Sequence, residues 1–298
     1  MTNAFEKINP ALIDAPSPQV GPHDGYTDEH KAADTYDALM SAAGEAAREF
    51  PEELYIDPSN WPDKARDNDT YHTWGVNYVD RFTNQDPTHE CTCHALRTVA
   101  EGARNKQLGI IYQDGPKKGE RYDESKKGSV WLSPLSVYAE ANPQQWGGAG
   151  CLQVLDISCR RGFLPEKIQP AEYGFKHTLH GTTGRGGVNQ SRGSWVRLSN
   201  FPDGWQETAK LFKPQEVIVC REFEQVVSLV LHGYLVEVGR KGHAIPYAFL
   251  NLESWAMGYV DSYDVIRYDS KATVKSCANG AFTIVSMTTP DDWAKPAE

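Results

Sequence analysis

Three residues, Cys93, His243 and Asp269, have the side chains that nucleophilic catalysis needs. A cysteine attacks a carbonyl carbon as its thiolate, a histidine takes up or gives a proton near neutral pH, and a carboxylate can hold the imidazole in one orientation. Together they would support acyl transfer through a covalent thioester. Because His243 follows Cys93 by 150 residues, the fold has to bring them together.

Cys93 lies where a polar, proline-containing stretch meets a predicted helix. Apolar residues recur behind it at helical spacing, at Leu96, Val99, Ala100 and Ala103. The thiol would therefore lie in the first turn, where unpaired N–H groups and the positive end of the helix dipole favour a thiolate. The plain alternative is that Cys93 is a small buried residue of the core.

His243 and Asp269 lie in two predicted strands. The β-branched and aromatic runs at 242–250 and 264–270 are typical of strands, and a predicted loop, 251–263, joins them. If the two strands pair as a hairpin, the start of the first lies beside the end of the second. This pairing would place the Asp269 carboxylate against the His243 imidazole.

The remaining patterns predict a largely helical first half and a largely β second half. Residues 1–50 form a predicted arm that contains an Ala-rich helical stretch, 27–50. Residues 51–80 form a predicted aromatic, loop-like lead-in to the main domain. Further predicted segments are the helices 150–161, stopped by Gly162, and 222–231, the strands 234–239 and 281–287, and the polar or Gly-rich loops 113–129 and 181–195.

Composition limits the function classes. The formal net charge of −10 argues against a general affinity for nucleic acid or anionic membranes, and 40% hydrophobic residues suffice for a core. No apolar run predicts a signal peptide or a membrane span, so we expect a cytoplasmic or virion-associated protein. Six cysteines in 298 residues are too sparse for a disulfide scaffold. We expect no cofactor.

Four segments, in order, resemble the papain-like cysteine peptidases over roughly residues 76–298. Asn84, Gln85 and Cys93 are similar to the family's NQGxCGSCWAF, Leu132-Ser133-Pro134 and Gly147-Gly148 to its LSPQ and NGG, Gly242-His243-Ala244-Ile245 to its GHAV, and Asp269-Ser270 with Asn279-Gly280 to its Asn-Ser and Asn-Gly. The separation of Cys93 and His243 agrees with the ~130 to 150 residues of papain-type enzymes. Compared with this family motif, two extra residues separate Gln85 from Cys93.

This resemblance implies an α+β fold with two lobes, a helical lobe with the nucleophile helix and an antiparallel β lobe with the histidine and the carboxylate. It divides the chain into an arm and lead-in, 1–75, and a peptidase domain, 76–298. It implies peptide hydrolysis with Cys93 as nucleophile, His243 as acid and base, Asp269 as its orienting group, and Gln85 in the oxyanion hole. Gly147 and Gly148 would pair with the backbone of an extended peptide or protein substrate, unless they form a plain turn.

Alternatives stay open. Glu253, followed by Ser254-Trp255, offers a second register for the third triad residue. The HECTCH segment, 89–94, is rich in zinc-ligand types. A disulfide between Cys91 and Cys151 is possible. The protein could instead be a catalytically weak papain-fold structural or assembly protein, including a virion component whose arm binds a protein partner, or an amide hydrolase or transferase acting on cell-wall peptides.

Overall fold

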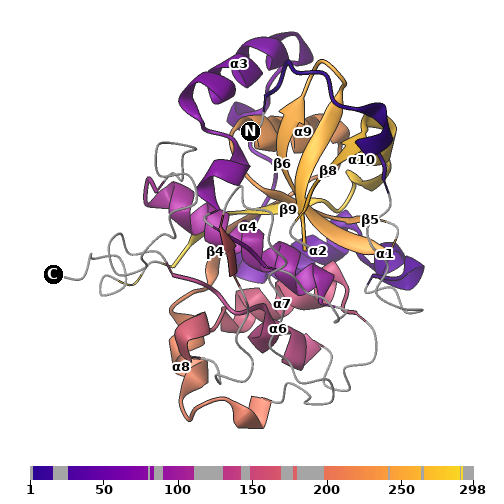
Figure 1. Ribbon diagram of the computed structural model, residues 1–298. Coiled ribbons are helices and arrows are strands. Elements are labelled where there is room, and N and C mark those ends of the chain that lie inside the picture. Colours follow the sequence, from indigo (N-terminus) through magenta and orange to yellow (C-terminus); the bar gives the residue numbers. More distant parts are fainter. Residues whose placement is uncertain are drawn as a thin grey trace, which may run out of the picture.

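The central element of the computed structural model is helix α4 (Cys91–Gln107), most of which is buried. The structure describes residues 3–15, 26–79, 81–83, 90–110, 130–141, 148–168, 177–179, 198–240, 242–262, 265–288 and 290. Figure 1 shows α4 between a β-sheet on one side and a group of helices on the other. The sheet contacts α4 mainly through two of its strands, and the helices α6 and α7 contact it from the opposite side.

The main sheet of the described residues has the strand order β1-β4-β9-β5-β6-β7-β8. Every neighbouring pair in it is antiparallel except β1 and β4, which are parallel. The strands are β1 (Ala47–Arg48), β4 (Pro214–Val219), β5 (Val236–Arg240), β6 (His243–Asn251), β7 (Ala256–Asp261), β8 (Val265–Ser270) and β9 (Phe282–Met287). A separate antiparallel pair consists of β2 (Arg81–Thr83) and β3 (His177–Leu179).

The helices divide between two sides of this sheet and the long arm that precedes it. They are α1 (Asp28–Ala33), α2 (Tyr36–Ala43), α3 (Trp61–Tyr71), α6 (Pro134–Ala141), α7 (Cys151–Arg161), α8 (Trp205–Lys210), α9 (Phe223–Leu231) and α10 (Lys271–Cys277). Helices α6, α7 and α8 lie together below α4 in Figure 1, whereas α9 and α3 lie beside the sheet above it. The fold therefore has a helical part and a β part that meet at α4.

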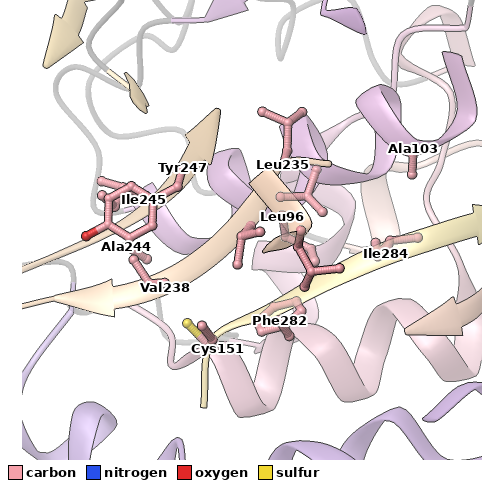
Figure 2. Close-up of a cluster of buried hydrophobic side chains, with 14 of the residues drawn as sticks. Leu96, Ala103, Cys151, Leu235, Val238, Ala244, Ile245, Tyr247, Phe282 and Ile284 are labelled. Carbon is pink, nitrogen blue, oxygen red and sulfur yellow. The ribbon is translucent and has the colours of Figure 1, made fainter. Parts of the chain in front are cut away.

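One hydrophobic core joins the two parts. Leu96 and Ala103 of α4 pack with Ala244 and Phe282 of the sheet, and Cys151 of α7 reaches the same cluster from below, as Figure 2 shows. All five residues are buried. The apolar face that the sequence predicted for this helix thus faces the core, which fixes the helix start against the sheet.

The predicted fold class is confirmed. A helical part with the cysteine helix and an antiparallel β part with His243 is the division that the resemblance to papain-like peptidases implied. The predicted helix 150–161 is α7, and it ends at Gly162, whose φ of 89° favours glycine. A Cβ on Gly162 would also lie 2.0 Å from the carbonyl oxygen of Ala209.

Three elements differ from the prediction. The lead-in, 51–80, contains helix α3, whose buried Trp61 and Ala65 pack it onto the body of the protein. Strand β4 was not predicted. The predicted loop 251–263 contains strand β7, which lies between β6 and β8, so those two strands do not pair. This last difference changes the predicted site.

The N-terminal region packs onto the rest of the chain. Strand β1 joins the sheet beside β4, α2 packs against α7, and the backbone of Ile13 bridges to Tyr268 of β8. The boundary at residue 75 stays a prediction. The predicted loops 113–129 and 181–195 lie outside the described residues. No helix in the described part of the chain is long and apolar enough to cross a membrane.

Candidate active site

Cys91 is the first residue of helix α4. The preceding residue, Glu90, makes no side-chain hydrogen bond that caps the helix, so the first turn keeps backbone N–H groups without partners inside the helix. These groups and the helix dipole stabilise an anion at Cys91. The Cys91 side chain is fully buried, with 0% of its surface exposed.

His243 begins β6, and Asp261 ends β7. Because these strands are antiparallel neighbours, with Asn251 opposite Ala256 at the far end, the start of β6 lies beside the end of β7. The Nε2 atom of His243 lies 2.8 Å from Oδ1 of Asp261. The hydroxyl of Ser262 is also within reach, at 3.2 Å from the same nitrogen.

The other side of the His243 ring meets Cys91. The imidazole and the Cys91 sulfur are close enough for the charge of each to shift the pKa of the other, with further contributions at Cys91 from hydrogen bonding to His243 and to the backbone of Ala244. Since Nε2 contacts Asp261, Nδ1 is left for Cys91. Cys91, His243 and Asp261 therefore form a continuous row of interacting side chains from the start of α4 to the end of β7.

The electrostatics of this chain favour a thiolate and an imidazolium. Burial alone would raise the pKa of Cys91, but the facing His243 and the hydrogen bond from Ala244 lower it below its ordinary value. Burial alone would lower the pKa of His243, but the charges of Cys91 and then Asp261 raise it to about 10. Each partner thus stabilises the charged form of the other, as a reactive cysteine requires.

The structure does not place Cys93 at this site, contrary to the prediction. Helix α4 begins two residues earlier than predicted, and two residues correspond to a rotation of roughly 200° about the helix axis. Cys93 is buried on another face. Burial, followed by the charge of Glu90, raises the pKa of the Cys93 thiol well above its ordinary value. A thiol in this state is a poor nucleophile.

The prediction that Asp269 contacts His243 is wrong. Asp269 is on β8, and β7 separates that strand from β6. Its carboxylate accepts hydrogen bonds from Tyr247, at 2.8 Å, and from Arg240. The alternative, Glu253, is exposed in the turn between β6 and β7, at the end of the hairpin far from His243. Asp261, at the opposite end, was not predicted.

The predicted substrate-contacting residues are only partly described. Gln85 and Gly147 lie outside the described residues, and Gly148 lies just before α7. Their roles stay predictions. Gln85 precedes Cys91 by six residues, which is the separation of glutamine and nucleophile in NQGxCGSCWAF. This spacing, together with Asp261-Ser262 as an Asn-Ser equivalent, is the sequence feature that would have identified the two missed residues.

The other cysteine alternatives can be compared with the structure in part. All six cysteines are free thiols, so Cys91 and Cys151 are not joined by a disulfide. Within the described ranges, no group of three or more potential ligand side chains is arranged to hold a metal ion. His89 of the zinc alternative lies outside these ranges.

A segment of the N-terminal arm is fixed beside His243. The backbone of Tyr26 bridges to Gly242, the residue before His243. The Tyr26 hydroxyl donates to Asp34 at 2.8 Å, and the same carboxylate accepts the N–H groups of Cys151 and Leu152, both at 2.8 Å. Asp34 thus caps the start of α7 and connects the arm to the helical part.

We expect Asp34→Ala to lower the free energy of unfolding by about 1–3 kcal/mol, because it leaves buried donors without an acceptor. Chemical denaturation measures this loss. The exposed Asp203, replaced by alanine, is the control and should change stability by less than about 0.5 kcal/mol. Equal effects of the two replacements would contradict the capping role of Asp34.

No family model and no curated protein sequence matches this chain. Among solved structures, xylellain, a cysteine protease from Xylella fastidiosa, is similar, with 13% identity, a TM-score of 0.46, and coverage of 71% of this chain and 85% of that chain. The proCathepsin B S9 from Trypanosoma congolense has 8% identity, a TM-score of 0.49, and coverage of 87% and 89%. Because both TM-scores lie below 0.5, the functional assignment rests on the geometry described above.

Proposed function

We propose that this protein is a cysteine peptidase in which Cys91 is the nucleophile, His243 the acid and base, and Asp261 the residue that orients His243. The observation that carries the proposal is the row of these three side chains at the start of a buried helix, in which His243 contacts Asp261 at 2.8 Å and interacts with Cys91. A cysteine, a histidine and a carboxylate in this order are the arrangement that activates a thiol for acyl transfer.

In the proposed reaction, the Cys91 thiolate attacks the carbonyl carbon of a peptide bond. His243 gives its proton to the leaving amine as the carbon–nitrogen bond breaks, which leaves a thioester on Cys91. Neutral His243 then takes a proton from water, whose oxygen attacks the thioester and releases the carboxylic acid product. The backbone N–H of Cys91 is available for the oxyanion, and Gln85 remains the predicted second donor.

We expect the pH dependence of kcat/KM to be bell-shaped. The acid limb follows the lowered pKa of Cys91, and the alkaline limb follows the loss of the His243 proton, near pH 10. The imidazolium contributes its stability fully below pH ~6.5, the unfolded value, and this contribution is lost as the pH rises through about 10. The thiolate contribution has the opposite sign: it is lost as the pH falls through the lowered pKa of Cys91. If kcat/KM does not rise with pH until the ordinary thiol pKa is reached, the ion pair of the Cys91 thiolate with the His243 imidazolium is contradicted.

A structural or assembly role in the same fold is the second candidate. The complete burial of Cys91 favours it, because a substrate reaches the sulfur only when neighbouring groups move. Incubation with a peptide library, followed by mass spectrometry of the products, separates the candidates. Cleaved peptides support the proposal, and products joined to an added amine support a transferase. An intact library, together with a Cys91 that an epoxide inhibitor does not modify, supports the structural role.

A further inference from the structure

The carboxylate of Asp261 has a second charged partner besides His243. While its Oδ1 atom faces Nε2 of His243, its Oδ2 atom lies 2.7 Å from Nε of Arg267, on the neighbouring strand β8. The Asp261 side chain is 0% exposed and that of Arg267 is 14% exposed. A single buried carboxylate therefore bridges the imidazole and a guanidinium.

The register of β7 and β8 explains this contact. Tyr259 lies opposite Arg267, and Asp261 lies opposite Val265. Residues two apart on a strand point to the same face, so Arg267 is the diagonal neighbour of Asp261 on that face. A long side chain such as arginine spans the diagonal distance, whereas a short one does not.

The resulting row of groups alternates in charge. It begins with the Cys91 thiolate and continues through the His243 imidazolium and the Asp261 carboxylate to the Arg267 guanidinium. Two negative and two positive charges cancel. Without Arg267 the buried row would carry a net negative charge, and a buried charge without a partner is strongly unfavourable.

We propose that Arg267 is a positioning residue of the active site: its guanidinium keeps the Asp261 carboxylate ionised and oriented, and thereby keeps His243 and Cys91 in their charged forms. This inference rests on the proposed function only in taking Cys91 and His243 as the reacting pair. Arg267 acts through Asp261.

Other titratable and charged groups surround this row. Cys93, Tyr138, Cys151 and Glu237 interact electrostatically with Cys91, and Arg240 of β5 lies opposite His243. Tyr259, on the same face as Asp261, interacts electrostatically with both Asp261 and Arg267. Its hydroxyl accepts a hydrogen bond from Arg240 at 2.7 Å, and Arg240 in turn pairs with Asp269. This second pair has the same exposure as the first, 14% for the arginine and 0% for the carboxylate. Arg240 is therefore a matched control for Arg267.

The test measures the Cys91 thiolate directly. An acid titration follows the ultraviolet absorbance of thiolates in the full-length protein, and the difference from Cys91→Ser isolates the signal of Cys91. In Arg267→Met we expect the acid limb of this signal to move up by about one pH unit. Without the guanidinium, the Asp261 carboxylate is less readily ionised and supports the imidazolium that favours the thiolate less well. In Arg240→Met the limb should stay at the wild-type pH, although both variants lose a buried ion pair.

Two further variants keep the test decisive where Arg267→Met folds poorly. Arg267→Lys retains the positive charge, so its acid limb should lie near that of the wild type. The Asp261→Asn variant has no carboxylate for Arg267 to pair with. In this background, Arg267→Met should shift the acid limb of the thiolate absorbance much less than it does in the wild type.

The outcomes separate this inference from the proposed function. If the wild type has no thiolate below the ordinary thiol pKa, the proposed function fails. A second outcome is a wild type that has this thiolate, while Arg267→Met leaves the acid limb of the thiolate absorbance in place or moves it only as much as Arg240→Met does. That result would refute the role of Arg267 alone. An equal shift in the Asp261→Asn background would also refute it.

Discussion

The Cys91→Ser variant is expected to lose peptide hydrolysis by about a millionfold in kcat, whereas Cys93→Ser should keep the wild-type rate. Burial alone would raise the pKa of Cys91, but the charge of His243 lowers it below its ordinary value. Burial, followed by the charge of Glu90, raises the pKa of Cys93 well above its ordinary value. Steady-state kinetics on a peptide found by library screening measures both variants.

The two serine variants are matched controls for each other. Both residues lie in the first turn of α4 and both are buried. A difference in rate between the two variants therefore reflects the position of the thiol relative to His243, and not the loss of a buried cysteine in general. A Cys93→Ser variant that loses activity while it remains folded would contradict the assignment. Circular dichroism establishes that each variant is folded before its rate is compared.

The second large effect is expected at Asp261. Asp261→Ala removes the group that holds Nε2 of His243 at 2.8 Å, so the imidazole loses its orientation and the favourable charge beside it. We expect kcat to fall by about a hundredfold to ten-thousandfold. Measurement of kcat and KM separately should show that the loss lies in kcat, because Asp261 is not expected to contact the substrate.

Asp269→Ala is the matched comparison. Asp269 is equally buried and pairs with Arg240, so its loss should destabilise the protein by about 3–5 kcal/mol. Its carboxylate contacts Tyr247 and Arg240, so the rate per folded molecule should stay close to that of the wild type. Loss of kcat in Asp269→Ala with an unaffected Asp261→Ala would restore the original prediction from the sequence.

The sequence predicted the helix of the proposed nucleophile well, but not which cysteine faces the histidine. Apolar spacing at Leu96, Val99 and Ala103 defines the buried face of a helix over many residues. The first residue of a helix is much less certain, by one or two positions. Because Cys91 and Cys93 are two residues apart, an error of that size exchanges one face of the helix for another.

The misassignment of the carboxylate has a different cause. The start of β6 does lie beside the end of the next strand, as a hairpin requires. The next strand is β7, whose sequence AMGYVD includes Ala256 and Gly258 and has few of the residues that favour strands. A sequence pattern that leaves β7 as a loop pairs β8 with β6, which exchanges Asp261 for Asp269.

Long-range pairing limits what local patterns reveal about this site. His243 was identified because a glycine, a histidine and a strand occur together in the sequence. The ion pair of Asp261 with Arg267 depends on the register of β7 and β8, which follows from the packing of the whole sheet.

Nitrogen NMR of the His243 imidazole during a pH titration reports on the pairing of His243 with Cys91 and does not depend on access of a substrate to the buried sulfur. In the wild type and in Cys93→Ser, we expect the ring to stay protonated up to about pH 10. In Cys91→Ser the ring should lose its proton at a lower pH, since the thiolate charge is gone. A Cys91→Ser variant that leaves the titration of His243 unchanged, or a Cys93→Ser variant that lowers it, would contradict the account.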